Sequence, residues 1–300
     1  MSSSTTPPLT TVYLKLLLAA LFWGGTFIAG KLLAAEVPPF SAAFLRFAMA
    51  TLLLLALTCR AFGRLPRINR DDLLPFLLLG LSGVFVYNAL FFGGLARIEA
   101  SRAAVIIANN PVMIALFAAL IYRERLTLLK ILGILLSVAG AVTVVVRGNL
   151  SLLVNGGVGW GEVMIFGCVI SWTVYSLVGR RAMRNVSPLV AVTYSALTGT
   201  LLLFPFALRE GLAWHLTDYA LSSWVALGYL ALFGTVLGFV WYYQGIVAIG
   251  SMRAGQFINF VPIAGVSLSV LFLGEPLTWS LLAGLLLVSS GLFLTNKRTG

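Results

Sequence analysis

One stretch of this chain, from Pro111 to Gly140, occurs a second time 151 positions further along. Each copy consists of an apolar run opened by a proline, a short charged turn, and a second apolar run with two glycines. The aligned pairs are Pro111 and Pro262, Glu124 and Glu275, Leu126 and Leu277, Thr127 and Thr278, Gly133 and Gly284, and Gly140 and Gly291. Because a repeat of this length is one structural unit used twice, we expect the chain to fold as two similar halves.

The repeat lies in a sequence that is too apolar for a soluble domain. Hydrophobic residues make up 60% of the chain and charged residues only 10%, and the mean hydropathy is +1.02. A membrane-spanning helix needs roughly 20 mostly apolar residues. Ten such runs occur, near residues 11–33, 40–59, 73–95, 102–122, 126–146, 159–179, 188–208, 222–247, 252–273 and 279–295. The sequence therefore predicts an all-α polytopic membrane protein with ten transmembrane helices.

The basic residues predict how these helices are oriented. Fourteen Lys and Arg residues fall on the side of the N-terminus and five on the other side, so the positive-inside rule places both termini in the cytoplasm. A second match, offset by 149, aligns Trp23 with Trp172 and Pro39 with Pro188, which leaves five helices in each half. Since five is odd, residues 150–300 would enter the membrane from the side opposite to residues 1–149. Such inverted repeats are typical of secondary transporters.

Side chains that carry enzymatic chemistry are scarce. His215, the one histidine, lies in a polar loop, and Cys59 and Cys168 sit within apolar runs. No catalytic triad, metal-ligand spacing or phosphate-binding loop is present in the sequence. We therefore expect no enzyme activity, no catalytic residue, no cofactor and no metal. The net charge of +11 is attributed to cytoplasmic loops and not to nucleic-acid binding.

Glycines and aromatic residues share one face of two predicted helices. The first set is Gly83, Tyr87, Phe91 and Gly94, and the second is Gly234, Gly238, Tyr242 and Gly245, with Trp241 alongside. Spacings of three and four residues place each set on one helix face. Small residues allow close helix approach, while a buried ring with a polar tip suits a cavity wall. We interpret the stripes as partly packing and partly cavity lining; pure packing with interfacial aromatic anchors is the alternative.

Two tryptophans occupy matching positions in the halves, Trp23 in the first predicted helix and Trp172 in the sixth, with Tyr175 shortly after the latter. Trp23 falls near mid-depth and not in the interfacial belt where tryptophan is common. An indole N–H at that depth needs a polar partner, so both tryptophans are expected to face the interior of the bundle.

Amide side chains fall in or at the ends of four predicted helices. They are Asn88, Asn109, Asn110, Gln244, Gln256 and Asn259. Because an amide in hydrocarbon is costly without a partner, these residues are expected to face the bundle interior or a wet cavity. Pro111 and Pro262 each leave a backbone carbonyl without its helical partner. Such a carbonyl either binds a substrate ammonium group or is satisfied by the neighbouring amide.

Arg46 is the exception among the basic residues, because it lies inside a predicted helix, roughly 9 Å from its external end. One interpretation is that its guanidinium holds a substrate carboxylate or locks a gate. The other is structural, as a conformational tie or a snorkelled anchor. The acids all fall at or near helix ends, which argues against proton coupling through a mid-membrane carboxylate. Glu124 and Glu275 are expected to cap or tie helix ends.

Trp23, Arg46, Trp172 and the two copies of the repeated pattern resemble the EamA-type exporters of the drug/metabolite transporter superfamily, and most closely the bacterial amino-acid exporters of the YddG type. The resemblance covers nearly the whole chain and implies a central cavity lined by the first, third, fourth, sixth, eighth and ninth helices. The candidate substrate-binding residues are Trp23, Tyr87, Asn88, Phe91, Asn109, Asn110, Trp172, Tyr175, Trp241, Tyr242, Gln256 and Asn259. The candidate gating or structural residues are Arg46, Gly94, Pro111, Glu124, Gly245, Pro262 and Glu275.

The sequence thus predicts a bacterial inner-membrane exporter of amino acids and related small metabolites that works by alternating access. Its expected partners are a small-molecule substrate and the lipid bilayer; it binds no nucleic acid and acts as a monomer or a weak homodimer. Export of drugs or other metabolites by the same fold is the first alternative. A membrane-embedded protein without transport activity is the second.

Overall fold

A computed structural model of the chain describes residues 8–122, 127–149, 158–182, 186–249 and 251–296. Within these ranges the regular secondary structure is helical throughout. Nine of the described helices are long and apolar enough to cross a membrane, and the shorter apolar helix Trp279–Thr295 follows them. The all-α, multi-span architecture expected from the apolar runs is therefore confirmed. Glu124, one of the predicted capping residues, lies outside the described ranges.

The first half of the chain starts with two long helices and then becomes segmented. Its elements are α1 (Leu9–Glu36), α2 (Pro39–Phe62), α3 (Arg70–Leu79), η1 (Gly80–Val86), α4 (Tyr87–Leu95), α5 (Ala100–Ile107), α6 (Asn110–Tyr122) and α7 (Leu128–Val145). The run expected as one helix over 73–95 is α3, η1 and α4, and the run over 102–122 is α5 and α6. Pro111 is the second residue of α6, where a proline fits because the first N–H groups of a helix have no partner within it.

The second half follows the same order. Its elements are α9 (Trp160–Ala182), α10 (Pro188–Arg209), α11 (Leu212–His215), α12 (Leu221–Tyr229), η2 (Leu230–Leu237), α13 (Gly238–Ile249), α14 (Ser251–Gln256), η3 (Phe257–Asn259), α15 (Phe260–Leu273) and α16 (Trp279–Asn296). The run expected over 252–273 is divided into α14, η3 and α15, with Pro262 near the start of α15.

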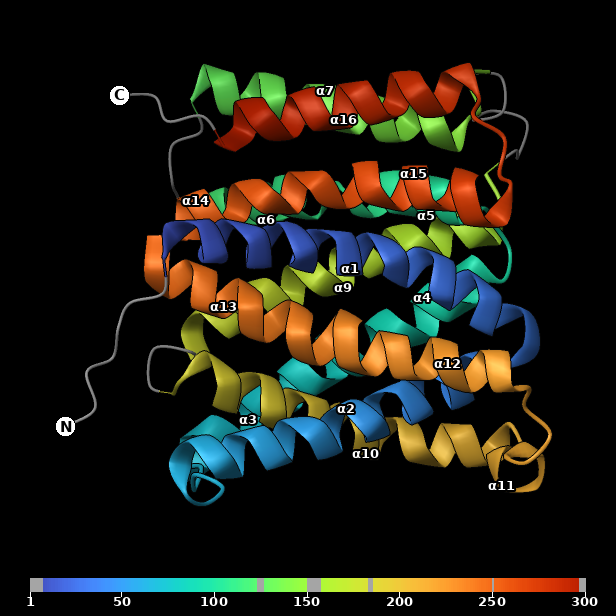
Figure 1. Ribbon diagram of the computed structural model, residues 1–300. Helices are drawn as coiled ribbons and strands as arrows, with labels where there is room; N and C mark the ends of the chain where they lie inside the picture. The colour runs from blue at the N-terminus through green and yellow to red at the C-terminus, as the bar shows by residue number, and fades with distance from the viewer. Residues whose placement is uncertain (1–7, 123–126, 150–157, 183–185, 250, 297–300) are drawn as a thin grey trace.

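The long helices lie side by side in one bundle, as Figure 1 shows. α1 begins and α16 ends at the same end of the bundle, which we call the termini face; the other end is the opposite face. Helices from the two halves of the chain pack against each other, α2 along α10 and α7 along α16, and α1 contacts both α13 and α15. The two halves of the sequence therefore share one interior.

The glycines of the repeated stretch bring α7 and α16 into close contact. A Cβ atom added at Gly133 would lie 2.6 Å from the carbonyl oxygen of Gly291, and one added at Gly140 would lie 2.7 Å from that of Gly284. Only glycine permits such an approach of two backbones. These residues therefore pack within one chain and form a scaffold at the edge of the bundle.

Gly140→Ala is expected to destabilise the fold by about 1–3 kcal/mol, because the added methyl group would force α7 away from α16. Thermal unfolding in detergent measures the effect. Gly228→Ala is the matched control, since nothing lies within 4 Å of a Cβ atom there, and alanine has the higher helix propensity. Equal melting temperatures for the two variants would contradict the close approach of these helices.

Two segments of π-helix, η1 and η2, interrupt equivalent crossings of the two halves. The backbone N–H of Tyr87 bonds to the carbonyl of Ser82, and that of Gly238 bonds to the carbonyl of Phe233, each five residues earlier. A π-helical segment widens the helix and frees carbonyl groups from the regular ladder, and such segments are frequent at functional sites. Both segments lie near the middle of the bundle (Figure 1).

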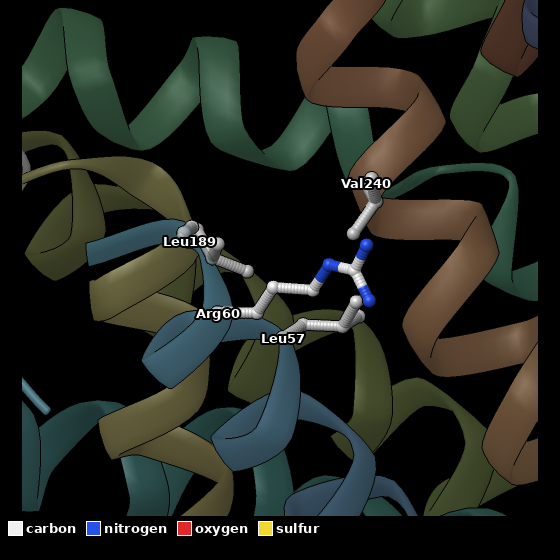
Figure 2. Close-up of a pocket in the computed structure, with 5 residues that line it drawn as sticks. Leu57, Arg60, Leu189 and Val240 are labelled. Atoms are coloured by element: carbon white, nitrogen blue, oxygen red, sulfur yellow. The ribbon is translucent and has the colours of Figure 1, made fainter. Parts of the chain in front are cut away.

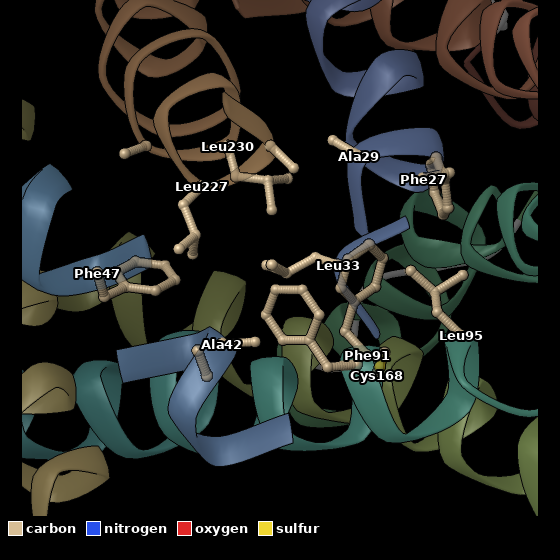
Figure 3. Packing of buried hydrophobic residues seen from close by; sticks show 14 of the residues in the cluster. Phe27, Ala29, Leu33, Ala42, Phe47, Phe91, Leu95, Cys168, Leu227 and Leu230 are labelled. Carbon is tan, nitrogen blue, oxygen red and sulfur yellow. The ribbon is translucent and has the colours of Figure 1, made fainter. Parts of the chain in front are cut away.

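The main hydrophobic core lies beside these segments. It joins residues of α1, α2, α4, α9 and η2, among them Phe27, Ala42, Phe91, Cys168 and Leu230 (Figure 3). Cys168 is fully buried among these apolar side chains, as its position in an apolar run predicts. The core fixes the faces of α1, α4 and α9 that point to the centre of the bundle.

Candidate functional site

Aromatic rings from α4 and α9 meet near the centre of the bundle. The ring of Tyr87 stacks on that of Phe91 with centroids 5.9 Å apart and lies 5.5 Å from Trp172. Trp172 in turn stacks on Tyr175 at 4.9 Å. These four residues were all predicted from the sequence as cavity residues, and the helices bring them together.

Rings from α1 and α13 extend this group. Phe239 lies 6.2 Å from Trp172 and 5.7 Å from Trp23 between centroids, and Trp23 lies 5.3 Å from Tyr242. We call eight of the connected rings the aromatic network: Trp23, Tyr87, Phe91, Trp172, Tyr175, Phe239, Tyr242 and Tyr243. Phe27 and Phe92 contact this network through Phe91. Four helices, two from each half of the chain, thus share one aromatic wall.

The π-helical segment η2 supplies the polar partner of Trp23. Its indole Nε1 donates a hydrogen bond to the carbonyl oxygen of Gly234 at 3.0 Å. In an α-helix the Gly234 carbonyl would accept from the N–H of Gly238, but in the widened segment that N–H bonds to the carbonyl of Phe233. An added Cβ at Gly238 would lie 2.6 Å from the Trp23 Nε1 atom, so the glycine also makes room for the ring.

Two members of the network, Phe239 and Tyr243, were not among the predicted site residues. On α13, Phe239 lies three residues before Tyr242, and Tyr243 lies one residue after it. Tyr242 is the only predicted α13 residue that joins the network. Trp241 instead packs against Phe22 at 5.5 Å, in a separate group with Phe233. Adjacent helical residues point about 100° apart, so Trp241 and Tyr242 do not share a face.

Arg46 is buried, with 8% of its surface exposed, and points into the bundle. Its Nη1 donates to Asn88 Oδ1 at 3.0 Å and its Nη2 to Thr235 Oγ1 at 3.3 Å, which links α2 to α4 and η2. No carboxylate of the described residues forms an ion pair with it, and its buried Nε has no hydrogen-bond partner among them. A buried cation without a counter-charge is costly. Arg46 thus forms the predicted tie between helices, and its Nε–H group remains as a donor for an anion.

The predicted amide side chains differ in burial and in whether they have hydrogen-bond partners. Asn109 accepts a hydrogen bond from Ser137 Oγ at 2.8 Å and donates to backbone carbonyls of α5, so it holds α5 against α7. The Oδ1 atoms of Asn110 and Asn259 are buried and have no hydrogen-bond partner among the described residues. Gln256 is exposed, and Gln244 is exposed and accepts from Lys15 at 3.0 Å.

The predicted glycines Gly94 and Gly245 serve packing. A Cβ atom at Gly94 would lie 2.6 Å from Ile165 side-chain carbons, and one at Gly245 would lie 2.5 Å from Leu16 Cδ2. Pro262 is buried. These residues allow α4 and α13 to approach their neighbours and do not themselves offer a polar group to a ligand.

Carboxylates tie the two halves together at the opposite face. Glu275 accepts hydrogen bonds from the backbone N–H groups of Ala100 and Ser101 at 2.7 and 2.9 Å, and so caps the N-terminus of α5. Glu210 accepts from the N–H of Ser41 at 2.7 Å in the first turn of α2. A carboxylate at a helix N-terminus satisfies free N–H groups and complements the helix dipole. Glu275 therefore has the capping geometry that its position at a helix end predicts.

A buried ion pair completes this set of contacts. Arg102 Nη2 lies 2.8 Å from Glu162 Oε1, its Nη1 lies 3.2 Å from Glu99, and its Nη2 also donates to the carbonyl of Val145 at 2.9 Å. Burial alone would raise the pKa of Glu99, but its own backbone hydrogen bond and the Arg102 charge outweigh that and lower the pKa below its ordinary value. Glu99 is therefore ionised at neutral pH, and the opposite face is held by charge-assisted contacts.

Glu275→Gln is expected to lower stability by about 1–3 kcal/mol, because one amide oxygen replaces two charged acceptors at the start of α5. Thermal unfolding at neutral pH measures this. Asp218→Asn is the matched control, since Asp218 pairs with His215 at the end of α11 and both side chains are mostly solvated; such a change is expected to stay within about 0.5 kcal/mol. A Glu275→Gln protein as stable as the control would contradict the capping role.

The bundle has a cleft on the side of the termini face. Its volume is about 370 Å³, and it is lined by Leu57, Arg60 and Ala61 of α2, Leu189 of α10 and Val240 of α13. Figure 2 shows the Arg60 guanidinium extending from α2 toward Val240. Val240 directly follows Phe239 of the aromatic network in α13, and none of the rings of the network lines the cleft.

These features define a polytopic helical membrane protein with aromatic rings near its centre, polar contacts at the opposite face and a cleft near the termini face. The EamA-like transporter family matches residues 10–146 and again residues 159–297. The chain belongs to this family, and it is a transporter of the EamA type.

Relatives of similar length are known from several bacteria. The uncharacterized transporter YyaM of Bacillus subtilis is 29% identical, over 95% of this chain and 93% of its own length. The uncharacterized inner membrane transporter YicL of Salmonella typhimurium is 28% identical, over 94% of each chain. A crystal structure with 20% sequence identity matches 96% of this chain and 98% of its own with a TM-score of 0.64, which shows that the fold is shared.

Proposed function

We propose that this protein exports amino acids, including aromatic and other neutral ones, and related small metabolites across the bacterial inner membrane by alternating access. The observation that carries the proposal is the aromatic network, to which both halves of the chain contribute helices. Stacked rings offer an apolar wall for a substrate side chain, and the tyrosine hydroxyls offer polar tips. Arg46 Nε and the Oδ1 atoms of Asn110 and Asn259, which have no hydrogen-bond partner within the described ranges, would hold its polar head group.

The proposed mechanism uses two inverted five-helix repeats, residues 1–149 and 150–300, with both termini in the cytoplasm. Support comes from the matching order of elements, with η1 and η2 in equivalent crossings, and from the two family matches. The polar contacts at the opposite face and the cleft near the termini face fit a state that is open toward the cytoplasm. Rocking of the repeats would break the polar contacts at the opposite face and close the cleft near the termini face. The in-chain packing of Gly133 and Gly140 favours a monomer as the transporting unit.

Transport of radiolabelled phenylalanine into proteoliposomes tests the proposed function. Trp172→Ala is expected to raise the KM about three- to ten-fold, because Trp172 contacts three rings of the network. Trp279→Ala is the matched control, since Trp279 is 86% exposed on α16, and it should leave transport unchanged. If Trp172→Ala remained folded and transported like the control, the aromatic network would not be the substrate site.

Coupling to an ion gradient is tested in the same vesicles. The described carboxylates lie at or near helix ends, and Glu275, Glu210 and Glu162 there hold helix ends or Arg102. We therefore expect substrate to move down its own gradient in the absence of an imposed proton or sodium gradient. Uptake that appears only when one of these gradients is applied would contradict uncoupled transport.

A further inference from the structure

Two arginines occupy one stripe of α2 between the cleft and the centre of the bundle. Arg46, Leu53, Leu57 and Arg60 are separated by seven, four and three residues, a spacing that keeps them on one helix face. Arg60 follows Arg46 by about 21 Å along the helix axis. Arg60 and Leu57 line the cleft, whereas Arg46 is buried against α4 and η2. Along this face of α2, Arg60 is exposed at the cleft and Arg46 is buried in the bundle.

The charge along this stripe is uncompensated. The residues that line the cleft are apolar apart from Arg60, and no acid is among them. At the inner end no described carboxylate pairs with Arg46, whose Nε is buried without a partner. The acids that do pair with bases or helix ends in the bundle lie at the opposite face. Positive charge is thus present at the cleft, on Arg60, and again in the interior of the bundle, on Arg46.

We propose that the pathway selects substrates with a net negative charge, namely apolar or aromatic monocarboxylates such as acylated amino acids, over the zwitterionic and cationic forms. The inference rests on the proposed function and narrows its substrate class. Arg60 attracts the carboxylate into the cleft, and Arg46 receives it in the interior, where a counter-charge relieves the cost of the buried guanidinium. The Oδ1 atoms of Asn110 and Asn259, which have no hydrogen-bond partner among the described residues, can accept an amide N–H as well as an ammonium N–H, so they do not require a cationic amine.

The selection is tested with three labelled probes that share the same ring and differ in charge. They are N-acetylphenylalanine (anion), phenylalanine (zwitterion) and phenylalanine methyl ester (cation). Initial rates are measured in proteoliposomes with the membrane potential clamped at zero, and rates in protein-free vesicles are subtracted. We expect the kcat/KM for the anion to exceed that for the zwitterion by about ten-fold or more, because only the anion brings an unbalanced negative charge to the buried arginine. The cation is expected to be slowest.

Variants then locate the effect on α2. Arg60→Gln is expected to lower the preference for the anion about two- to five-fold at low salt, mainly through KM, and the difference should shrink at high salt because exposed charges are screened. Arg64→Gln is the matched control: it removes the same charge four residues further on, beyond the end of α2, at an exposed residue that does not line the cleft. This control should keep the full preference.

Three outcomes would overturn the inference. Equal or faster transport of the zwitterion or the cation by the unmodified protein would show that net charge is not selected. An anion preference that Arg60→Gln and Arg64→Gln reduce equally would assign it to general surface charge. Transport of none of the three probes would refute the proposed function itself, and the inference with it.

Discussion

A bilayer offers no water to backbone groups, so the broken ends and widened turns of these helices must find partners within the protein. Three of the described breaks or widened turns do so through side chains from distant parts of the chain. Trp23 bonds to the Gly234 carbonyl in the widened segment η2, Lys31 donates to the carbonyls of Leu95 and Ile98 at 2.7 and 2.9 Å, and Glu275 caps α5. Each of these contacts ties one helix to another, so the requirement for backbone satisfaction also determines how the bundle is assembled.

The same requirement separates the bundle into parts with different roles. α7 and α16 are continuous, and their glycines pack backbone against backbone, which leaves a rigid edge. The crossings that contain η1 and η2, by contrast, are irregular at the level of the aromatic network. Irregular backbone within a membrane is tolerated where protein or a cavity surrounds it. The irregular crossings are thus the ones that place Tyr87, Asn88 and Phe239 around the proposed substrate.

Much of the architecture could be predicted from the sequence, because apolar runs and a long internal repeat are strong signals. The sequence also predicted the inward-facing rings Trp23, Tyr87, Trp172 and Tyr242. The two tryptophans occupy matching positions in the two halves, and helical spacing places the tyrosines on inward faces. The π-helical segments η1 and η2 could not be predicted, because their hydrogen-bond pattern has no distinct residue signature beyond a glycine. Phe239 was missed for that reason: its direction depends on how η2 widens before α13. The partners of Arg46 and Glu275 lie on other helices and required the tertiary structure.

The central claim is that the aromatic network and Arg46 form one substrate site. A structure determined with N-acetylphenylalanine bound tests it most directly. The account predicts that the phenyl ring lies among Trp23, Trp172 and Phe239, with its carboxylate within hydrogen-bond distance of the Arg46 guanidinium. A ligand bound elsewhere, or one whose carboxylate faces away from Arg46 while its ring avoids the network, would contradict it.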